Sequence, residues 1–89
     1  MKSSGHNPHL KAAFLEVVEK QLRDNDHPET RQTLERLLKE GFNEQDAKLL
    51  IASVIAAESY AVLKTKTVFN RDRFTRNLDR LPDQSFESE

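Results

Sequence analysis

The residue whose type and position point most directly to chemistry is Glu58, a carboxylate in the middle of the apolar segment 47–63. At about 100° per residue, a helix over this segment places Glu58 on one face with Ile51 and Val54. A helix that is apolar almost all round is usually buried, and a buried carboxylate needs a cationic partner, a proton or water. We therefore expect Glu58 to be buried and hydrogen-bonded or ion-paired. Lys11 or an arginine of the second or fourth expected helix is the expected partner.

Two interpretations of Glu58 stand side by side. A carboxylate in an apolar pocket has a raised pKa and can act as an acid, a base or a ligand, which suggests a small enzyme or a ligand-binding protein centred on Glu58. Catalysis requires a second group, and Ser53 and Ser59 have no adjacent histidine that would support nucleophilic chemistry. The sequence therefore favours a structural role, in an ion pair or a polar seam between subunits, and predicts no catalytic residue.

The end of the chain contains a second group of candidate residues, all basic. They are Lys66, Arg71, Arg73, Arg76 and Arg80. With Asp72 and Asp79, residues 66–81 hold five positive and two negative side chains, a net charge of +3. Such a patch is able to meet phosphates, but acidic residues 83–89 follow directly, and no glycine-rich phosphate loop is present. A solvated helix face is favoured over nucleic-acid binding, which remains an alternative.

Metal and cofactor sites have little support in the sequence. There are no cysteines, and the three histidines are His6, His9 and His27. A structural zinc site needs about four nitrogen, sulfur or oxygen ligands, and two histidines straddling a helix start do not supply them. The sequence predicts no metal site and no cofactor.

Composition limits the class of protein. The chain has 89 residues, 36% hydrophobic and 33% charged, with a formal net charge of -1. These values fit one soluble domain without a global field that attracts nucleic acid or membranes. The first residues have no apolar stretch of signal-peptide type, and segment 47–63 is short for a membrane span and interrupted by polar residues. A reducing cytoplasm is the expected location, and no membrane association is expected.

Helix start and stop signals divide the chain. Proline follows a capping residue at Asn7-Pro8, and Asn43 and Asn70 have the position of N-caps. The start of the second helix is capped by Asp26 or His27. Gly41 fits a left-handed C-terminal cap, with the next residue, a phenylalanine, folding back on the helix.

These signals predict an all-α domain of four helices at about 8–24, 28–40, 43–64 and 70–81, packed around a long apolar third helix. We expect residues 1–6 to form a flexible N-terminus, 7–82 a single helical domain, and 83–89 an acidic flexible tail. No strand alternation and no internal repeat compete with this interpretation.

Several short motifs recur together, namely Asn7-Pro8-x-Leu10, Val18-Glu19-x-Gln21, Pro28-Glu29, Thr33-Leu34-x-Arg36-Leu37, Gly41 and Asp46-Ala47. They resemble a group of small uncharacterised bacterial helical proteins with the pattern NPxLH…VExQ…PPE…TLxRL…G…EA. The resemblance covers roughly residues 7–63 and implies a bacterial cytoplasmic protein without implying an activity. Relatives of this kind carry histidines at the positions of Lys11, Leu15 and Leu49, so the resemblance implies that any shared metal site is lost here.

The function expected from these observations is a non-enzymatic helical protein-interaction module. The third helix offers more apolar circumference than the thin stripes of three shorter helices can cover, and self-association would cover the remainder. The expected partner is a second copy of the chain or another protein. The alternatives are a small enzyme or ligand-binding protein centred on Glu58 and weak nucleic-acid binding through the arginine-bearing last helix.

Overall fold

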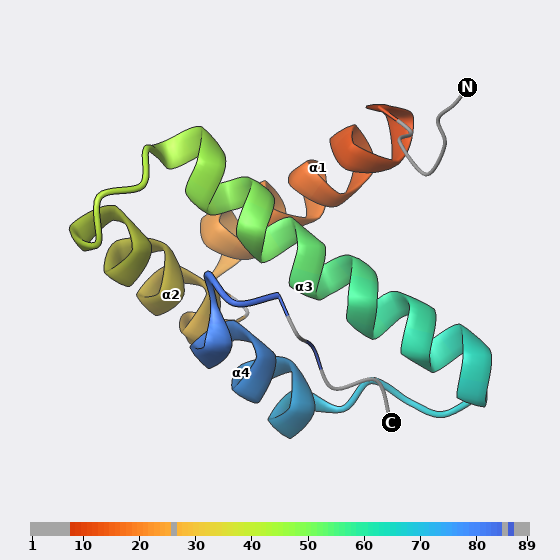
Figure 1. Ribbon diagram of the computed structural model, residues 1–89. Helices are drawn as coiled ribbons and strands as arrows, with labels where there is room; N and C mark the ends of the chain where they lie inside the picture. Colours follow the sequence, from red (N-terminus) through yellow and green to blue (C-terminus); the bar gives the residue numbers. More distant parts are fainter. Residues whose placement is uncertain (1–7, 26, 85, 87–89) are drawn as a thin grey trace.

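The computed structural model describes residues 8–25, 27–84 and 86, and these residues form four α-helices (Figure 1). They are α1 (Pro8–Asp24), α2 (Pro28–Lys39), α3 (Glu44–Thr65) and α4 (Arg71–Arg80). No strand occurs among the described residues. The predicted all-α class with four helices is confirmed, and each helix begins and ends within one residue of its predicted bounds.

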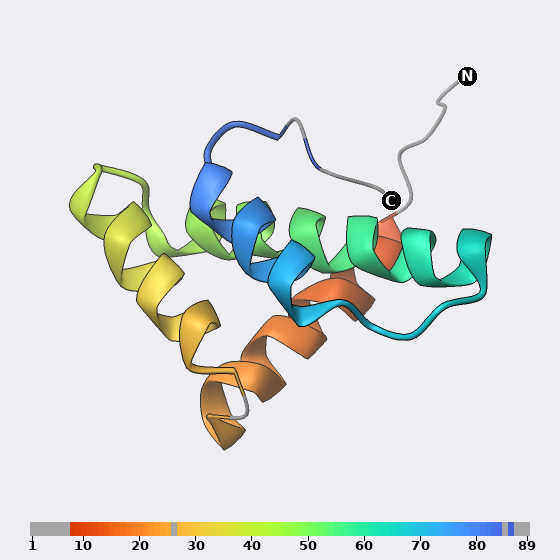
Figure 2. The same cartoon turned by 90° about the horizontal axis from the view of Figure 1, so that it is seen from below.

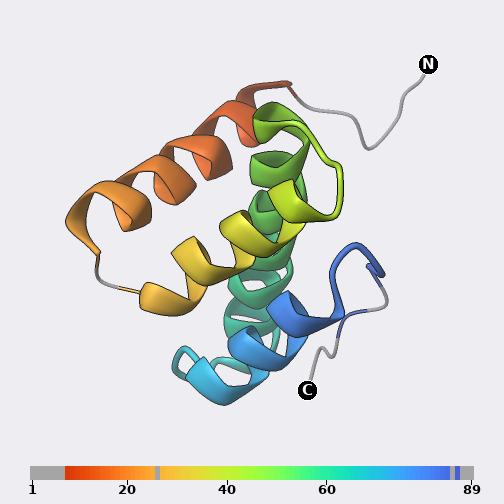
Figure 3. The ribbon, with the colours of Figure 1, turned by 90° about the vertical axis from the view of Figure 1, so that its left-hand side faces the viewer.

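The helix α3 is the centre of the domain, because α1, α2 and α4 all pack against it. Figure 2 shows α3 running along most of the length of the molecule, with α2 and α4 in front of it. In Figure 3, α1 and α2 extend to the left of α3, and α4 lies across the lower part of α3, where it also contacts α2. The fully buried side chains between them include Val18, Leu37, Ile51 and Phe74.

The corner between α2 and α3 is closed by backbone hydrogen bonds. Gly41 has φ +106°, its N–H donates to the carbonyl of Leu38, and the N–H of Phe42 donates to the carbonyl of Leu37, both at 3.1 Å. These two bonds are those of a Schellman C-cap, which needs a residue at positive φ after the helix. The predicted role of Gly41 is confirmed, and Phe42 packs against the core cluster as expected.

Side-chain caps begin two of the helices as predicted. The Asn43 side chain accepts a hydrogen bond from the N–H of Asp46 at 2.8 Å, and the Asn70 side chain accepts one from the N–H of Arg73 at 2.9 Å. The helix α2 begins differently, because its N-cap is His27 and no side chain makes a capping bond there. The alternative cap, Asp26, lies outside the described residues.

One expectation about α3 is not confirmed. The segment is apolar, but it is not buried around its whole circumference: Tyr60 is 64% and Leu63 is 76% exposed. The reason is length. The 22 residues of α3 span about 33 Å at 1.5 Å per residue, whereas α2 and α4 span about 18 and 15 Å, so the C-terminal turns of α3 extend past the helices that cover its centre.

The predicted flexible N-terminus, residues 1–6, lies wholly outside the described residues, and the predicted tail, residues 83–89, is described only in part. Residues 1–7, 85 and 87–89 lie outside the described residues. Within the rest of the predicted tail, the Gln84 amide donates to the hydroxyl of Ser53 at 3.0 Å, and the half-buried Phe86 packs against the core. In the part of the chain that the structure describes, no helix has the length and apolar character needed to cross a membrane.

Candidate functional site

Glu58 lies in the interior, 3% exposed, opposite Arg73 of α4, which is 4% exposed. Arg73 Nε donates to Glu58 Oε1 at 2.9 Å and Arg73 Nη2 donates to Glu58 Oε2 at 2.8 Å. This is the bidentate fork that a guanidinium makes with a carboxylate, the strongest hydrogen-bonded geometry for such a pair. The partner of Glu58 is thus an arginine of the fourth helix. Lys11, the other predicted partner, is part of α1, and its side chain is not among the described parts of the structure.

A third donor completes the shell of Glu58. The backbone N–H of Asn70 donates to Glu58 Oε2 at 2.9 Å. Asn70 is the N-cap of α4, and its side chain accepts the N–H of Arg73, so one short segment supplies both the cap and all three donors to Glu58. The segment between α3 and α4 is therefore fixed to α3 by Glu58 at a point 12 residues earlier in the chain.

The contacts decide the charge of Glu58. Burial acts to raise the pKa of its carboxyl, but the hydrogen bonds from Arg73 and Asn70 and the positive charge of Arg73 outweigh burial and hold the pKa below its ordinary value of 4.5. Glu58 is therefore ionised at neutral pH, and both of its oxygens are engaged. A group in this state joins two helices and is poorly suited to accept or give a proton during a reaction.

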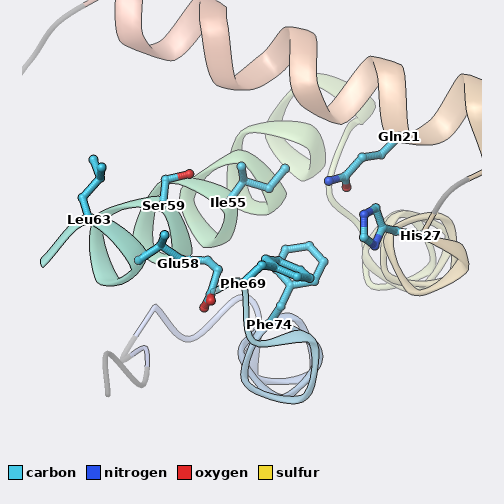
Figure 4. A pocket seen from close by; sticks show the side chains of 9 residues that line it. Gln21, His27, Ile55, Glu58, Ser59, Leu63, Phe69 and Phe74 are labelled. Atoms are coloured by element: carbon cyan, nitrogen blue, oxygen red, sulfur yellow. The ribbon is translucent and has the colours of Figure 1, made fainter. Parts of the chain in front are cut away.

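A pocket of about 480 Å³ lies next to the buried pair. Its wall is mostly apolar, and in Figure 4 side chains of α3 form one side while Gln21 and His27 approach from the other. The lining residues are Gln21, His27, Ile55, Glu58, Ser59, Val62, Leu63, Phe69 and Phe74. Its volume falls within the range of about 300–1,000 Å³ that is typical of small-molecule sites.

Three rings hold one wall of the pocket together. The ring centroid of His27 lies 5.8 Å from that of Phe69 and 5.9 Å from that of Phe74, in edge-to-face geometry in both cases. The centroids of Phe69 and Phe74 lie 5.4 Å apart. These are favourable aromatic separations. Phe69 directly precedes Asn70, so the anchoring of that segment by Glu58 also positions this wall.

The polar end of the pocket is formed by Gln21 and His27. Gln21 Oε1 accepts a hydrogen bond from the fully buried hydroxyl of Thr30 at 2.8 Å. His27 Nδ1 and Glu29 Oε2 lie 3.6 Å apart, and both are buried atoms without a hydrogen-bond partner. In the sequence, Gln21 is notable only as part of the motif Val18-Glu19-x-Gln21, and His27 only as a helix cap or a metal ligand. Their convergence depends on how α1 and α2 pack.

The basic residues of the C-terminal region do not form one uniform patch. Arg73 is buried against Glu58, and Arg71 Nη2 lies 3.0 Å from Glu29 Oε1 in an ion pair with α2. Lys66, Arg76 and Arg80 are exposed. At least two of the five cations already neutralise carboxylates of this chain, which reduces the charge available to phosphates.

The described residues contain no group of three or more histidine, aspartate or glutamate side chains arranged to hold a metal ion. His6 lies outside the described residues, and the side chain of His9 is not described either. No match to this chain was found among protein-family models, curated proteins or solved structures.

Proposed function

We propose that the protein is a non-enzymatic helical interaction module that associates with a second copy of itself through the uncovered end of α3. The observation that carries this proposal is the high exposure of Tyr60 and Leu63, at 64% and 76%. They are three residues apart and therefore neighbours on the helix surface. Val68, 83% exposed, lies in the following segment and adds a third apolar side chain.

One side of α3 supports a helix-to-helix contact. Leu49, Ser53 and Ala56, which are half-buried, and the exposed Tyr60 and Leu63 follow one another at spacings of four and three residues, and Gln84 covers part of this side at Ser53. This is the spacing of a and d positions in a helical seam, and it contains no charged side chain. A helix face that is meant only for solvent usually carries charges. An isologous pairing of two copies would bury the same face on each.

The expected association is weak. Burying Tyr60 and Leu63 of two copies contributes on the order of 4–9 kcal/mol after their partial burial in the monomer is discounted. Association opposes this with about 4–15 kcal/mol of lost freedom. The dimer is therefore expected to depend strongly on protein concentration.

The test is sedimentation velocity over a wide concentration range on the natural chain and two variants. We expect the natural chain to shift towards a dimer as concentration rises, and Tyr60→Glu to remain monomeric. Leu38→Glu is the matched control, because Leu38 is a 42% exposed apolar residue on α2, away from this face. A natural chain that is monomeric at every accessible concentration, or a control that disrupts association equally, would overturn the proposal.

The enzyme alternative has less support, because both oxygens of Glu58 are occupied by contacts that join α3 to α4. The nucleic-acid alternative is weakened by the ion pairs of Arg71 and Arg73. These arguments against an enzyme do not apply to ligand binding in the pocket beside Glu58, because the polar end of that pocket is formed by Gln21 and His27.

A further inference from the structure

Beyond self-association, we infer that the pocket between α1, α3 and the start of α4 binds an uncharged aromatic molecule that carries both a hydrogen-bond donor and an acceptor, such as a carboxamide. The inference rests on the shape of the pocket, on the polar atoms at one end, and on the charges around it.

The walls fit an aromatic body. Ile55, Val62 and Leu63 of α3 line the pocket together with Phe69 and Phe74, and the centroids of the two phenyl rings lie 5.4 Å apart. Aromatic ligands gain from edge-to-face and offset contacts with such rings beyond the gain from apolar burial. The volume of about 480 Å³ leaves room for a small molecule.

The polar end fits a group that both donates and accepts. Gln21 uses its Oε1 for Thr30, which leaves the Nε2 donors of the same amide to an acceptor in the pocket. The imidazole of His27 enters the pocket beside it, and a neutral imidazole offers one acceptor nitrogen. Ser59 adds a hydroxyl from the α3 side, where it can either donate or accept.

The charges exclude an anion. Among the described residues, no lysine or arginine lines the pocket, and its carboxylate, Glu58, is already neutralised by Arg73. At the polar end, Glu29 lies 3.6 Å from His27 Nδ1, and this carboxylate is paired with Arg71. A carboxylate ligand would lose its hydration in the pocket and find both neighbouring arginines already engaged by carboxylates of the chain. An uncharged polar group avoids that penalty.

The experiment is an NMR titration of the ¹⁵N-labelled protein with three probes of similar size, namely benzamide, toluene and benzoate. We expect benzamide to give saturable shifts at lining residues, with a dissociation constant in roughly the millimolar range for so small a molecule. Toluene lacks the polar group and benzoate carries a negative charge. Each is expected to bind at least tenfold more weakly.

Two variants locate the binding. Ser59→Trp fills the pocket from the α3 side and should reduce benzamide affinity at least tenfold, whereas Gln45→Trp on the exposed start of α3 should not. The pair Gln21→Leu with Thr30→Val removes both partners of one buried hydrogen bond, a change that is often tolerated. In this pair, the preference for benzamide over toluene should disappear.

The outcomes that would overturn the inference are distinct from those that test self-association. They are the absence of saturable shifts with benzamide, equal binding of benzoate, and unchanged benzamide binding in Ser59→Trp. Repeating the titration in Tyr60→Glu separates the two proposals, because Tyr60 does not line the pocket whereas Leu63 belongs to both the pocket and the association face. Saturable benzamide shifts are expected in this monomeric variant, and their absence there would overturn the inference irrespective of self-association.

Discussion

The two corners at the ends of α3 are built by different means. At its N-terminal end, the turn from α2 is closed by backbone bonds from Gly41 and Phe42 to carbonyls three and five residues earlier. At its C-terminal end, the turn into α4 is held by Glu58, whose partners lie 12 and 15 residues later. The first corner depends on one backbone conformation, and the second on a buried ion pair.

The difference determines how each corner fails. Loss of the Gly41 conformation strains one residue and leaves the surrounding side chains in place. Loss of either member of the Glu58–Arg73 pair leaves a charge in the interior without its partner, which is far more unfavourable than the loss of a solvent-exposed ion pair. The polar corner should therefore be the more sensitive of the two, although both are equally well ordered by hydrogen bonds.

The largest expected effect follows from Arg73→Leu. Glu58 would keep its burial and lose its cation, and the free energy of unfolding at neutral pH should fall by about 3–5 kcal/mol. Urea denaturation monitored by circular dichroism measures this change. The double variant Arg73→Leu with Glu58→Leu removes both charges and should recover most of the loss.

In Arg73→Leu, the pH dependence of the contribution of Glu58 to stability should also change sign. Burial without a cation raises the folded pKa of Glu58 above its unfolded value, so the contribution of this group is present at low pH and is lost as pH rises through the folded pKa. If the single and double variants were equally stable at neutral pH, the ion pair would not be what holds this corner.

A second test uses the pH dependence of the natural chain. The pKa of Glu58 is lowered in the folded state, so its stabilisation is present above its unfolded value of about 4.5 and is lost as pH falls through the lower folded pKa. The pKa of Glu29 is also lowered, since its own backbone N–H and Arg71 outweigh burial, and it contributes in the same direction. Thermal unfolding from neutral to acidic pH should show a falling melting temperature over this range.

The variant Glu58→Gln isolates the contribution of Glu58 to the pH dependence of stability. The substitution keeps the shape of the side chain but leaves Arg73 buried with an uncharged partner, and we expect a loss of roughly 2–4 kcal/mol at neutral pH. The difference from the natural chain should shrink as the pH is lowered. A difference that stays constant across the whole acidic range would contradict the ionised state of Glu58.

The smallest effect is expected at the Gly41 corner. Gly41→Val places a β-branched residue at φ +106° and should destabilise the protein by about 1–2 kcal/mol. A Cβ at this position meets no atom within 4 Å, so the cause would be backbone strain alone. Gly41→Asn is the matched control, because asparagine tolerates positive φ better than valine does. Its melting temperature should lie between those of the natural chain and Gly41→Val. A larger loss than in Arg73→Leu would reverse the comparison of the two corners.

Sequence reasoning reached the local features of this fold because their causes lie within a few residues. A capping side chain acts on an N–H three residues away, and a C-terminal glycine acts on its own φ. For this reason Gly41, Asn43 and Asn70 could each be identified from their neighbours, and with them the number and bounds of the helices. The apolar face around Glu58 likewise follows from helical periodicity alone.

The choice of Arg73 as the partner of Glu58 could not be made in this way. Five basic side chains of the last segment have similar local surroundings, and only the packing of α4 on α3 determines which of them turns inward. The exposure of Tyr60 and Leu63 depends in the same manner on how far the neighbouring helices reach along α3.

By itself, then, the sequence determined four helices, their caps and a carboxylate on a buried face, because short-range hydrogen bonds and side-chain periodicity are properties of neighbouring residues. Tertiary structure alone decided the Glu58–Arg73 pair, the uncovered end of α3, and the pocket in which Gln21 and His27 meet Phe69. Each of these joins residues from separate helices. Their distances depend on the packing of the whole core, which no local stretch of the chain encodes.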